Sequence, residues 1–305
     1  MRSAVIALCL AAASAARADG AAPADRDPPR RRDASWAELY GGRFRSSRLF
    51  SMPVADVVGA YQISLGGDYS LLQETGVLSS AGALAVGFGD IAQLEYRHTA
   101  AISIGQTTAP VPAVGVQLKV PLPERRYLPS WAVAFRLGVP RRERFGAMSV
   151  DEAVTDLYLV ARLRLGAVTL HGGARVSAAR IDVVDDGPGF HADRRLVLPT
   201  VGAELAMTSE ARLVAEIGLA PQFRFDPDAP ATPRIHPGGL GRLGVRWFLH
   251  PALCVDASLG YQVEVAGAQA VDRPSAVVQW DIRLGGEVFV PWGALACRAV
   301  GIFCE

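Results

Sequence analysis

From Val58 onward, apolar and polar residues alternate with a period of two in one segment after another. Between positions 155 and 165, Leu157, Leu159 and Leu163 share one parity, whereas Asp156 and Arg162 have the other. A period of two places successive side chains on opposite faces of a β-strand, whereas a helix repeats every ~3.6 residues. The pattern therefore predicts an all-β chain whose strands each have one apolar and one polar face.

Twelve segments follow this rule, and the strands are expected near residues 58–66, 82–88, 91–104, 112–121, 131–139, 154–165, 168–181, 195–207, 211–225, 238–249, 252–265 and 276–290. Most of them have at least the roughly 9–11 residues that a tilted strand needs to cross a membrane. After the first twenty positions, no uncharged apolar run reaches the ~18 residues of a spanning helix. A helical membrane protein is therefore excluded.

The connections between these segments alternate in length. Short turns are expected at 89–90, 166–167, 208–210 and 250–251, and longer loops at 67–81, 105–111, 140–153, 182–194, 226–237 and 266–275, with the turn at 122–130 longer than the others of its class. Bacterial outer-membrane barrels have short periplasmic turns and longer extracellular loops. With an even number of strands, both termini are then expected on the periplasmic side.

The N-terminal residues differ from the rest of the chain. Residues 1–18 combine Arg2, a short apolar stretch and a small-x-small site at Ala16–Ala18, which predicts a cleaved signal peptide. Residues 19–57 begin with a stretch rich in Pro, Asp and Arg and are interpreted as a flexible periplasmic leader. The alternative for this leader is a segment folded back into a pore.

Alternating faces occur in water-soluble sandwiches as well as in membrane barrels. Three features favour the barrel: the export signal, the long apolar faces of all twelve strands, and aromatic residues gathered at the strand ends. Trp131, Trp247 and Trp292 are expected at the periplasmic rim, and Trp280, Tyr261, Phe223 and Phe225 at the other. Because unpaired backbone groups cannot face hydrocarbon, the sheet must close on itself. We therefore expect a transmembrane, antiparallel, up-and-down barrel.

Over residues 58–292 the chain resembles the bacterial outer-membrane β-barrel class, and it resembles no particular subfamily. Residues 283–290 are similar to the final-strand signal by which such barrels are recognised for insertion. The chain departs from that pattern because it continues past its last strand into a tail, residues 293–305. The resemblance implies a place in the outer membrane, in contact with lipid, but no particular activity.

Charged residues of the polar faces are predicted to line the lumen. Eleven are bases: Arg97, Lys119, Arg136, Arg162, Arg164, Arg175, Arg212, Arg224, Arg242, Arg246 and Arg283. Eight are acids: Glu95, Asp156, Glu204, Glu216, Asp256, Glu264, Asp281 and Glu287. Opposite charges in a confined space are stabilised by pairing. They form either a salt-bridged plug or a narrow path with a slight preference for anions.

Other chemistry finds little support. The formal net charge of +1 gives no reason to expect nucleic acid as a partner. Neither His98 nor His171 precedes a serine by two positions, as in barrel lipases, and the loop around His191 has the composition of an ordinary turn. No glycine-rich phosphate motif occurs, and we expect no enzymatic activity, no cofactor and no metal.

Three cysteines follow the predicted cleavage site. Cys297 and Cys304 can close a small loop, and pairing of Cys254 with either of them is the alternative.

The function expected from these features is a narrow, porin-like channel for small solutes. The alternative is a structural or docking barrel of an envelope or polysaccharide-export assembly, with the leader and the tail contacting a periplasmic protein.

Overall fold

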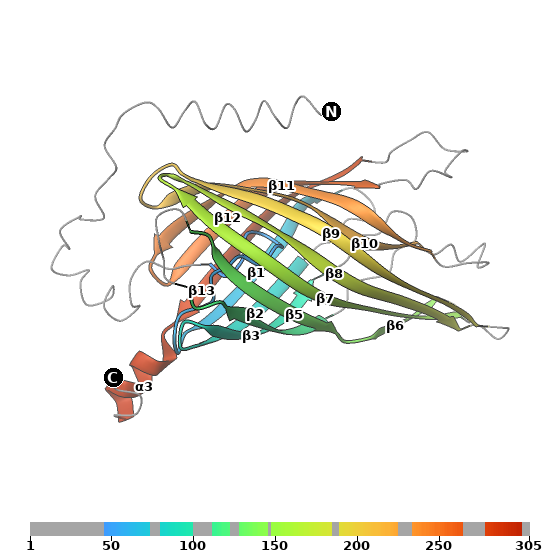
Figure 1. The fold of residues 1–305 in the computed structure, drawn as a ribbon, viewed down its shortest axis with the longest axis horizontal. Coiled ribbons are helices and arrows are strands. Elements are labelled where there is room, and N and C mark those ends of the chain that lie inside the picture. The colour runs from blue at the N-terminus through green and yellow to red at the C-terminus, as the bar shows by residue number, and fades with distance from the viewer. Residues whose placement is uncertain are drawn as a thin grey trace.

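The computed structural model describes residues 46–73, 80–99, 112–122, 128–145, 148–184, 189–224, 234–264 and 278–300. Its strands form one antiparallel sheet in the order β5-β4-β3-β2-β1-β13-β12-β11-β10-β9-β8-β7-β6, and an additional pairing of β5 with β7 closes the sheet on itself (Figure 1). The short β6 pairs only with β7, beyond the end of β5. Twelve strands therefore form the closed wall, which confirms the predicted antiparallel barrel.

The strands are β1 (Ile63–Gln73), β2 (Ser80–Phe88), β3 (Ala92–Thr99), β4 (Pro112–Lys119), β5 (Ser130–Gly138), β6 (Arg141–Phe145), β7 (Met148–Leu165), β8 (Val168–Val184), β9 (Phe190–Ala206), β10 (Ala211–Arg224), β11 (Arg234–His250), β12 (Leu253–Glu264) and β13 (Val278–Val290). One helix, α3 (Trp292–Val300), follows the last strand. Each predicted segment corresponds to one wall strand. The first begins later than expected, at Ile63 instead of residue 58.

Short turns gather at one end of the barrel, together with α3 (Figure 1). Gly89 and Asp90 between β2 and β3 have φ angles of 60° and 55°, and Gly166 between β7 and β8 has 63°. Glycine and aspartate adopt this left-handed conformation more easily than most residues, which suits them to tight hairpins. We call this the short-turn end and the opposite one the long-loop end.

The two faces of the wall carry the residues that the alternation predicted. On the outside, Leu159 of β7, Leu243 of β11 and Leu259 of β12 are 50%, 51% and 51% exposed. On the inside, Arg136, Arg246 and many other charged residues are buried. A soluble sandwich would bury its leucines and expose its ions. The apolar exterior and charged interior are therefore those of a membrane barrel. Among the described residues, no helix is long and apolar enough to cross a membrane.

The barrel interior is filled in two different ways. At the short-turn end, residues 46–58 lie inside the wall, and Leu49, Val54, Ala55 and Val58 are at most 2% exposed. The expected leader is thus corrected for residues 46–57, which belong to the folded interior; residues 1–45, including the predicted signal peptide, lie outside the described residues. At the long-loop end, inward-facing side chains of β7, β8 and β9 pack with Ile235 of β11 in an apolar cluster, the mouth cluster, made of Val150, Ala179, Ile181, Val183, Leu196, Leu198 and Ile235.

The C-terminal tail begins as a helix. The Gly293 N–H donates to the carbonyl of Tyr61 at 3.1 Å, and the rings of Tyr61 and Trp292 meet edge to face with centroids 5.5 Å apart. These contacts fix the start of α3 against the chain just before β1. Cys297 in α3 is disulfide-bonded, whereas Cys254 in β12 is a buried free thiol, which excludes the alternatives that pair Cys254. Cys304, the expected partner, lies outside the described residues.

Candidate functional site

The inner segment, residues 46–58, turns back on itself without joining the wall as a strand. An isolated bridge links Arg48 with Pro53, and the Leu49 N–H donates to the Met52 carbonyl at 3.0 Å. Because its other backbone groups are not part of the sheet, they need partners from the inward-facing side chains. The wall supplies these partners from strands that are far apart in the sequence.

Glu216 of β10 binds the turn of this segment. Its carboxylate accepts the backbone N–H groups of Phe50, Ser51 and Met52 at 3.1–3.2 Å and the Ser51 hydroxyl at 2.7 Å. Glu216 is 4% exposed, so its charge is balanced mainly by these donors. Hydrogen bonds to a charged acceptor are stronger than neutral ones, particularly where water is excluded.

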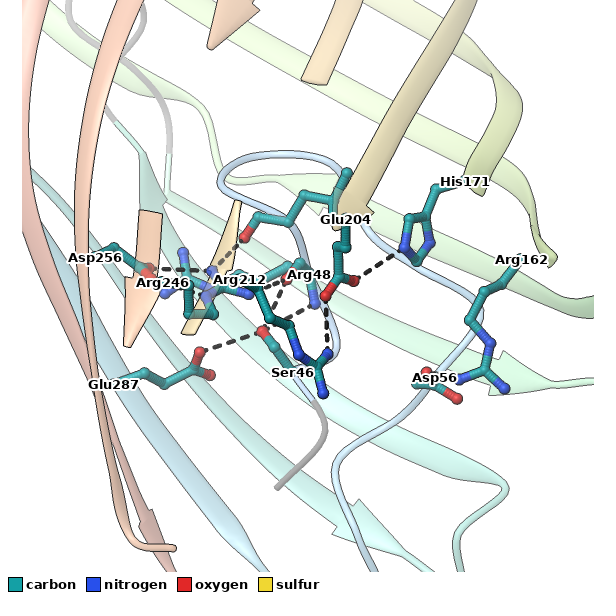
Figure 2. Close-up of polar contacts among 11 residues, drawn as sticks. Ser46, Arg48, Asp56, Arg162, His171, Glu204, Arg212, Arg246, Asp256 and Glu287 are labelled. Atoms are coloured by element: carbon teal, nitrogen blue, oxygen red, sulfur yellow. Dashed lines mark hydrogen bonds and ion pairs between the residues drawn. The ribbon is translucent and has the colours of Figure 1, made fainter. Parts of the chain in front are cut away.

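Arg246 of β11 binds the carbonyl groups of the segment, as Glu216 binds its N–H groups. Its guanidinium donates to the carbonyls of Arg48 and Leu49 at 3.0 and 2.9 Å, and it also pairs with Asp256 of β12 at 2.8 Å (Figure 2). Arg246 is 1% exposed. One buried cation thereby connects two wall strands to the inner segment.

The C-terminal half of the segment is fixed by three further side chains. Asp56 forms an ion pair with Arg162 of β7, seen at the right of Figure 2. Gln117 of β4 donates to the carbonyls of Val54 and Asp56 at 2.8 and 2.6 Å, and Gln93 of β3 accepts the N–H of Val58 at 2.9 Å. Partners on β3, β4, β7, β10 and β11 thus surround the segment from most sides of the barrel.

Apolar contacts complete the packing of the inner segment. Leu49, Met52, Val54 and Ala55 form one buried cluster with Ala132, Ala134, Tyr158, Val160 and Val214 of the wall. Gly202 of β9 leaves the space for this cluster, because a Cβ built there would lie 2.1 Å from Cδ1 of Leu49. The interior around this segment is therefore partly a small hydrophobic core.

Ion pairs also link neighbouring wall strands directly. Glu204 accepts from His171 at 2.9 Å and from Arg212 at 2.8 Å, an arrangement shown in Figure 2. Asp156 pairs with Arg175 of β8 at 3.7 Å and Asp68 with Arg283 of β13 at 3.0 Å, whereas Glu95 of β3 reaches past β4 to Arg136 of β5. Opposite charges on adjacent or next-but-one strands satisfy one another in this way.

Two small polar cavities remain beside the inner segment. One, of about 30 Å³, is lined by Arg162, Arg164, Arg212, Arg246 and the acids Asp56 and Glu204, among others. The second, of about 20 Å³, lies between Arg48, Asp68, Arg242 and Asp256. Such volumes hold little more than a water molecule or two. Neither of these two cavities is large enough to hold a solute bigger than water.

Most predicted lumen residues point inward as expected. Buried or half-buried inside the wall are Glu95, Arg97, Lys119, Arg136, Asp156, Arg162, Arg175, Glu204, Arg212, Glu216, Arg242, Arg246, Asp256, Arg283 and Glu287. Arg164 lines the larger cavity and is exposed near the short-turn end. The side chains of Arg224, Glu264 and Asp281 lie outside the described part of the chain.

Several functional contacts were not foreseen. Asp56 and the backbone groups of residues 48–57 were assigned to the leader, with a fold back into the pore only as the alternative, and Val58 was assigned to the first strand. The neutral side chains Gln93 and Gln117 were not singled out although they have inward parity. Because both glutamines lie on the polar faces of their strands, strand parity alone would have predicted that they point inward. No local sequence pattern predicts that the inner segment binds to side chains of the wall.

The rim at the long-loop end carries an outward group of charges. His191 and Arg180 both pair with Asp182, and Arg180 is 60% exposed. These positions lie beyond the part of β8 and β9 that crosses the membrane, because the strands have 17 residues each. Partial burial raises the pKa of Asp182, but the hydrogen bonds from His191 and Arg180 outweigh it and lower the pKa below its ordinary value. This is the pattern of a surface ion pair.

Comparisons with known proteins concern the fold alone. No protein-family model and no curated protein sequence matches this chain. The solved NanC porin covers 74% of this chain and 98% of its own length, with 10% identity and a TM-score of 0.41. The translocator domain of the autotransporter NalP from Neisseria meningitidis has 14% identity over 74% of this chain and 86% of its own, with a TM-score of 0.39.

A porin named KdgM, solved in complex with disordered oligogalacturonate, has 9% identity, covers 74% of this chain and 98% of its own, and also has a TM-score of 0.39. Each of these likenesses concerns the β-barrel fold alone and identifies no subfamily. In the described part of the chain, no group of three His, Cys, Asp or Glu side chains is arranged to hold a metal ion.

Proposed function

We propose that this protein is an outer-membrane channel for small solutes that is closed by its own inner segment and conducts when that segment leaves the lumen. The observation that carries the proposal is the mode of attachment: residues 46–58 lie inside the barrel but join none of its strands. Wall side chains bind them, mainly through Glu216, Arg246, Arg162, Gln93 and Gln117.

Barrel size supports this proposal. An eight-stranded barrel is filled by its own side chains, whereas barrels of about 16–18 strands leave an aqueous channel. Twelve strands lie between these cases, so the interior needs additional material to be filled. Here the inner segment supplies that material. Without it, a passage lined by charged side chains would remain.

The charge of the wall favours anions in the open state. The sequence predicts eleven bases and eight acids on the inner face, and the structure adds the acids Asp68 and Glu152, which leaves a small excess of bases. Departure of the inner segment also removes Asp56 from Arg162 and the carbonyls of Arg48 and Leu49 from Arg246. The guanidinium groups of Arg162 and Arg246 would then face the passage together with the carboxylate of Glu216, so the released bases outnumber the released acids by one.

The proposal is tested by recording currents across planar bilayers from the full chain and from a variant that lacks residues 46–57. We expect the full chain to be mostly silent and the variant to give stepwise conductance, with a reversal potential in a salt gradient that shows anion preference. Slower migration on SDS gels after boiling verifies that each protein is folded. A folded but silent deletion variant would contradict the proposal.

A docking barrel is the second candidate, and the apolar contacts of the inner segment favour it. Leu49, Met52 and Val54 pack against the wall as a permanent core would. If the deletion variant loses its fold altogether, while point variants that release the segment never conduct, the segment is structural. The outward surface, α3 and the residues before position 46 would then be the surfaces to examine for a partner.

A further inference from the structure

The wall contains a seam between β9 and β10 in its long-loop half. Pairing between these strands ends at Thr200 and Gly218. Beyond that point β9 continues to pair with β8 up to Phe190, and β10 with β11 up to Arg224. The two neighbours therefore part, although both remain strands.

Proline occupies both edges of this seam. Alternate residues of an antiparallel strand direct their backbone groups to opposite neighbours. The Ala206 N–H bonds to Ala167 on the β8 side and the Met207 N–H to Ala211 on the β10 side, so odd-numbered residues of β9 face β10. Pro199 is one of them and brings no N–H to this edge.

The same reasoning applies to β10. The carbonyl of Ala211 accepts from β9, whereas the carbonyl of Glu210 accepts from Phe248 of β11. Odd-numbered residues of β10 therefore face β9, and Pro221 is one of them. Two prolines thus remove donors from facing edges, which prevents the ladder from extending across the seam.

Beyond the seam, the β10–β11 hairpin passes behind β9. Ile217 of β10 and Leu243 of β11 lie on the lipid face and are 52% and 51% exposed. Leu219 and Ile235 have the same parity, but both pack against the mouth cluster, and Ile235 is 5% exposed. Arg194 of β9 donates to the Ile235 carbonyl at 2.7 Å. The lipid-side face of the hairpin end therefore rests on the inner face of β8 and β9.

This overlap creates an apolar layer whose edge meets the membrane. Val201 and Val197, the outward residues of β9 on either side of Pro199, are 60% and 73% exposed, so the start of the seam lies at the level of the lipid chains. Both layers behind it are apolar, with Leu198 and Ile181 on one side and Leu219 and Ile235 on the other. Arg195, the next outward residue of β9, is exposed, and the outward positions that follow it toward the long-loop end, Asp193 and His191, are polar.

We propose that the seam is a lateral binding site for the acyl chain of an anionic amphiphile, which inserts between the inner face of β9 and the β10–β11 hairpin. The acyl chain would replace contacts between apolar side chains with similar apolar contacts of its own. The backbone edges of β9 and β10 that have no partner in the β9–β10 ladder would stay shielded from the surrounding lipid. Arg195 binds the carboxylate or phosphate of the head. This site is independent of solute passage around the inner segment.

The test uses the folded full chain in phosphatidylcholine vesicles that contain a photoactivatable probe with its diazirine at the chain end. One arm uses a fatty acid and the other phosphatidylglycerol, and labelled residues are mapped by mass spectrometry. We expect labels on inward Leu198, Ile181 or Ile235 as well as on outward Val197. The arm that labels the interior identifies the source of the chain. Labels confined to outward residues in both arms would overturn the proposal.

Two variants sharpen this result. Pro199→Val combined with Pro221→Val restores two donors, so the ladder can extend, and we expect inward labelling to fall while outward labelling at Leu157 stays unchanged. Arg195→Glu should reduce inward labelling by about tenfold, the equivalent of one charge-assisted hydrogen bond. Arg142→Glu, the same charge change on β6, is its control.

Phe289, which is 1% exposed in β13 and lies outside the inner segment, serves as an internal standard, because labelling there would indicate an unfolded protein. If neither variant alters inward labelling of a folded protein, entry through the seam and the role of Arg195 are both wrong.

Discussion

The side chains at the two ends of the barrel are packed by different physical means. At the short-turn end, a separate segment is held largely by buried charges, such as Glu216 on three backbone N–H groups and Arg246 on two carbonyls. At the long-loop end, apolar side chains on one side of the wall, such as Ile181 and Leu198, pack against the end of the β10–β11 hairpin. Charged contacts are directional and lose much of their value when one partner is removed, whereas apolar contacts depend on area and volume. The short-turn end therefore depends on a few specific partners, and the long-loop end on buried apolar area and volume.

The largest effect should follow from removing the cation that joins the inner segment to the wall. Arg246→Met leaves Asp256 buried without its partner and the carbonyls of residues 48 and 49 without their donor. We expect a loss of about 3–5 kcal/mol in the free energy of unfolding, measured by urea titration. Arg142→Met at an exposed pair should cost at most about 1 kcal/mol. Equal losses of unfolding free energy in the two variants would contradict the idea that buried charge pairs stabilise the protein more than surface pairs.

The next effect concerns the long-loop end. Ile181→Ala deletes a fully buried side chain of the mouth cluster and should cost about 2–5 kcal/mol. Because no ion is involved, we expect the same loss in low and high salt. Val197→Ala, at a position that is 73% exposed to the outside, should have much less effect in the same titration. If the loss of stability in the Ile181 variant depended strongly on salt, charged contacts would also stabilise this end of the barrel.

A smaller effect is expected for the ion pair of Asp56 with Arg162. Asp56→Ala and Arg162→Ala should each increase the rate at which a thiol placed at buried position 47 reacts with a maleimide, since both loosen the inner segment. The double variant should react as fast as the single ones, with a coupling energy of about 0.5–3 kcal/mol. Additive effects would mean that the two residues act separately.

The smallest effect probes the segment without any change of charge. Gly202→Ala places a methyl group against Leu49, which has no room to move in its buried cluster. We expect a cost of about 1 kcal/mol and more frequent channel openings in planar bilayers. Gly172→Ala on the neighbouring strand is the control, because nothing lies within 4 Å of its added Cβ. Similar opening frequencies in the two variants would argue against release of the segment as the opening step.

How far each feature was predictable depends on the range of the interactions behind it. The strands and the inward position of Arg136 or Arg246 follow from parity alone, because one residue in two must face the lumen. The pairing of Glu95 with Arg136 needs the register of β3, β4 and β5, which the sequence leaves open. The seam was not foreseen. Pro199 and Pro221 are visible in the sequence, but their meaning depends on which neighbour each backbone group faces.

The sequence by itself determined the number of strands, the apolar outer face and the charged inner face, since these arise from a local repeat in which each residue needs only its own parity. The tertiary structure alone decided what occupies the interior. Glu216 and Arg246 bind backbone groups that are 164–198 positions away in the chain, and such contacts leave no periodic trace in either partner. They form only because the closed wall brings distant strands around the same short segment.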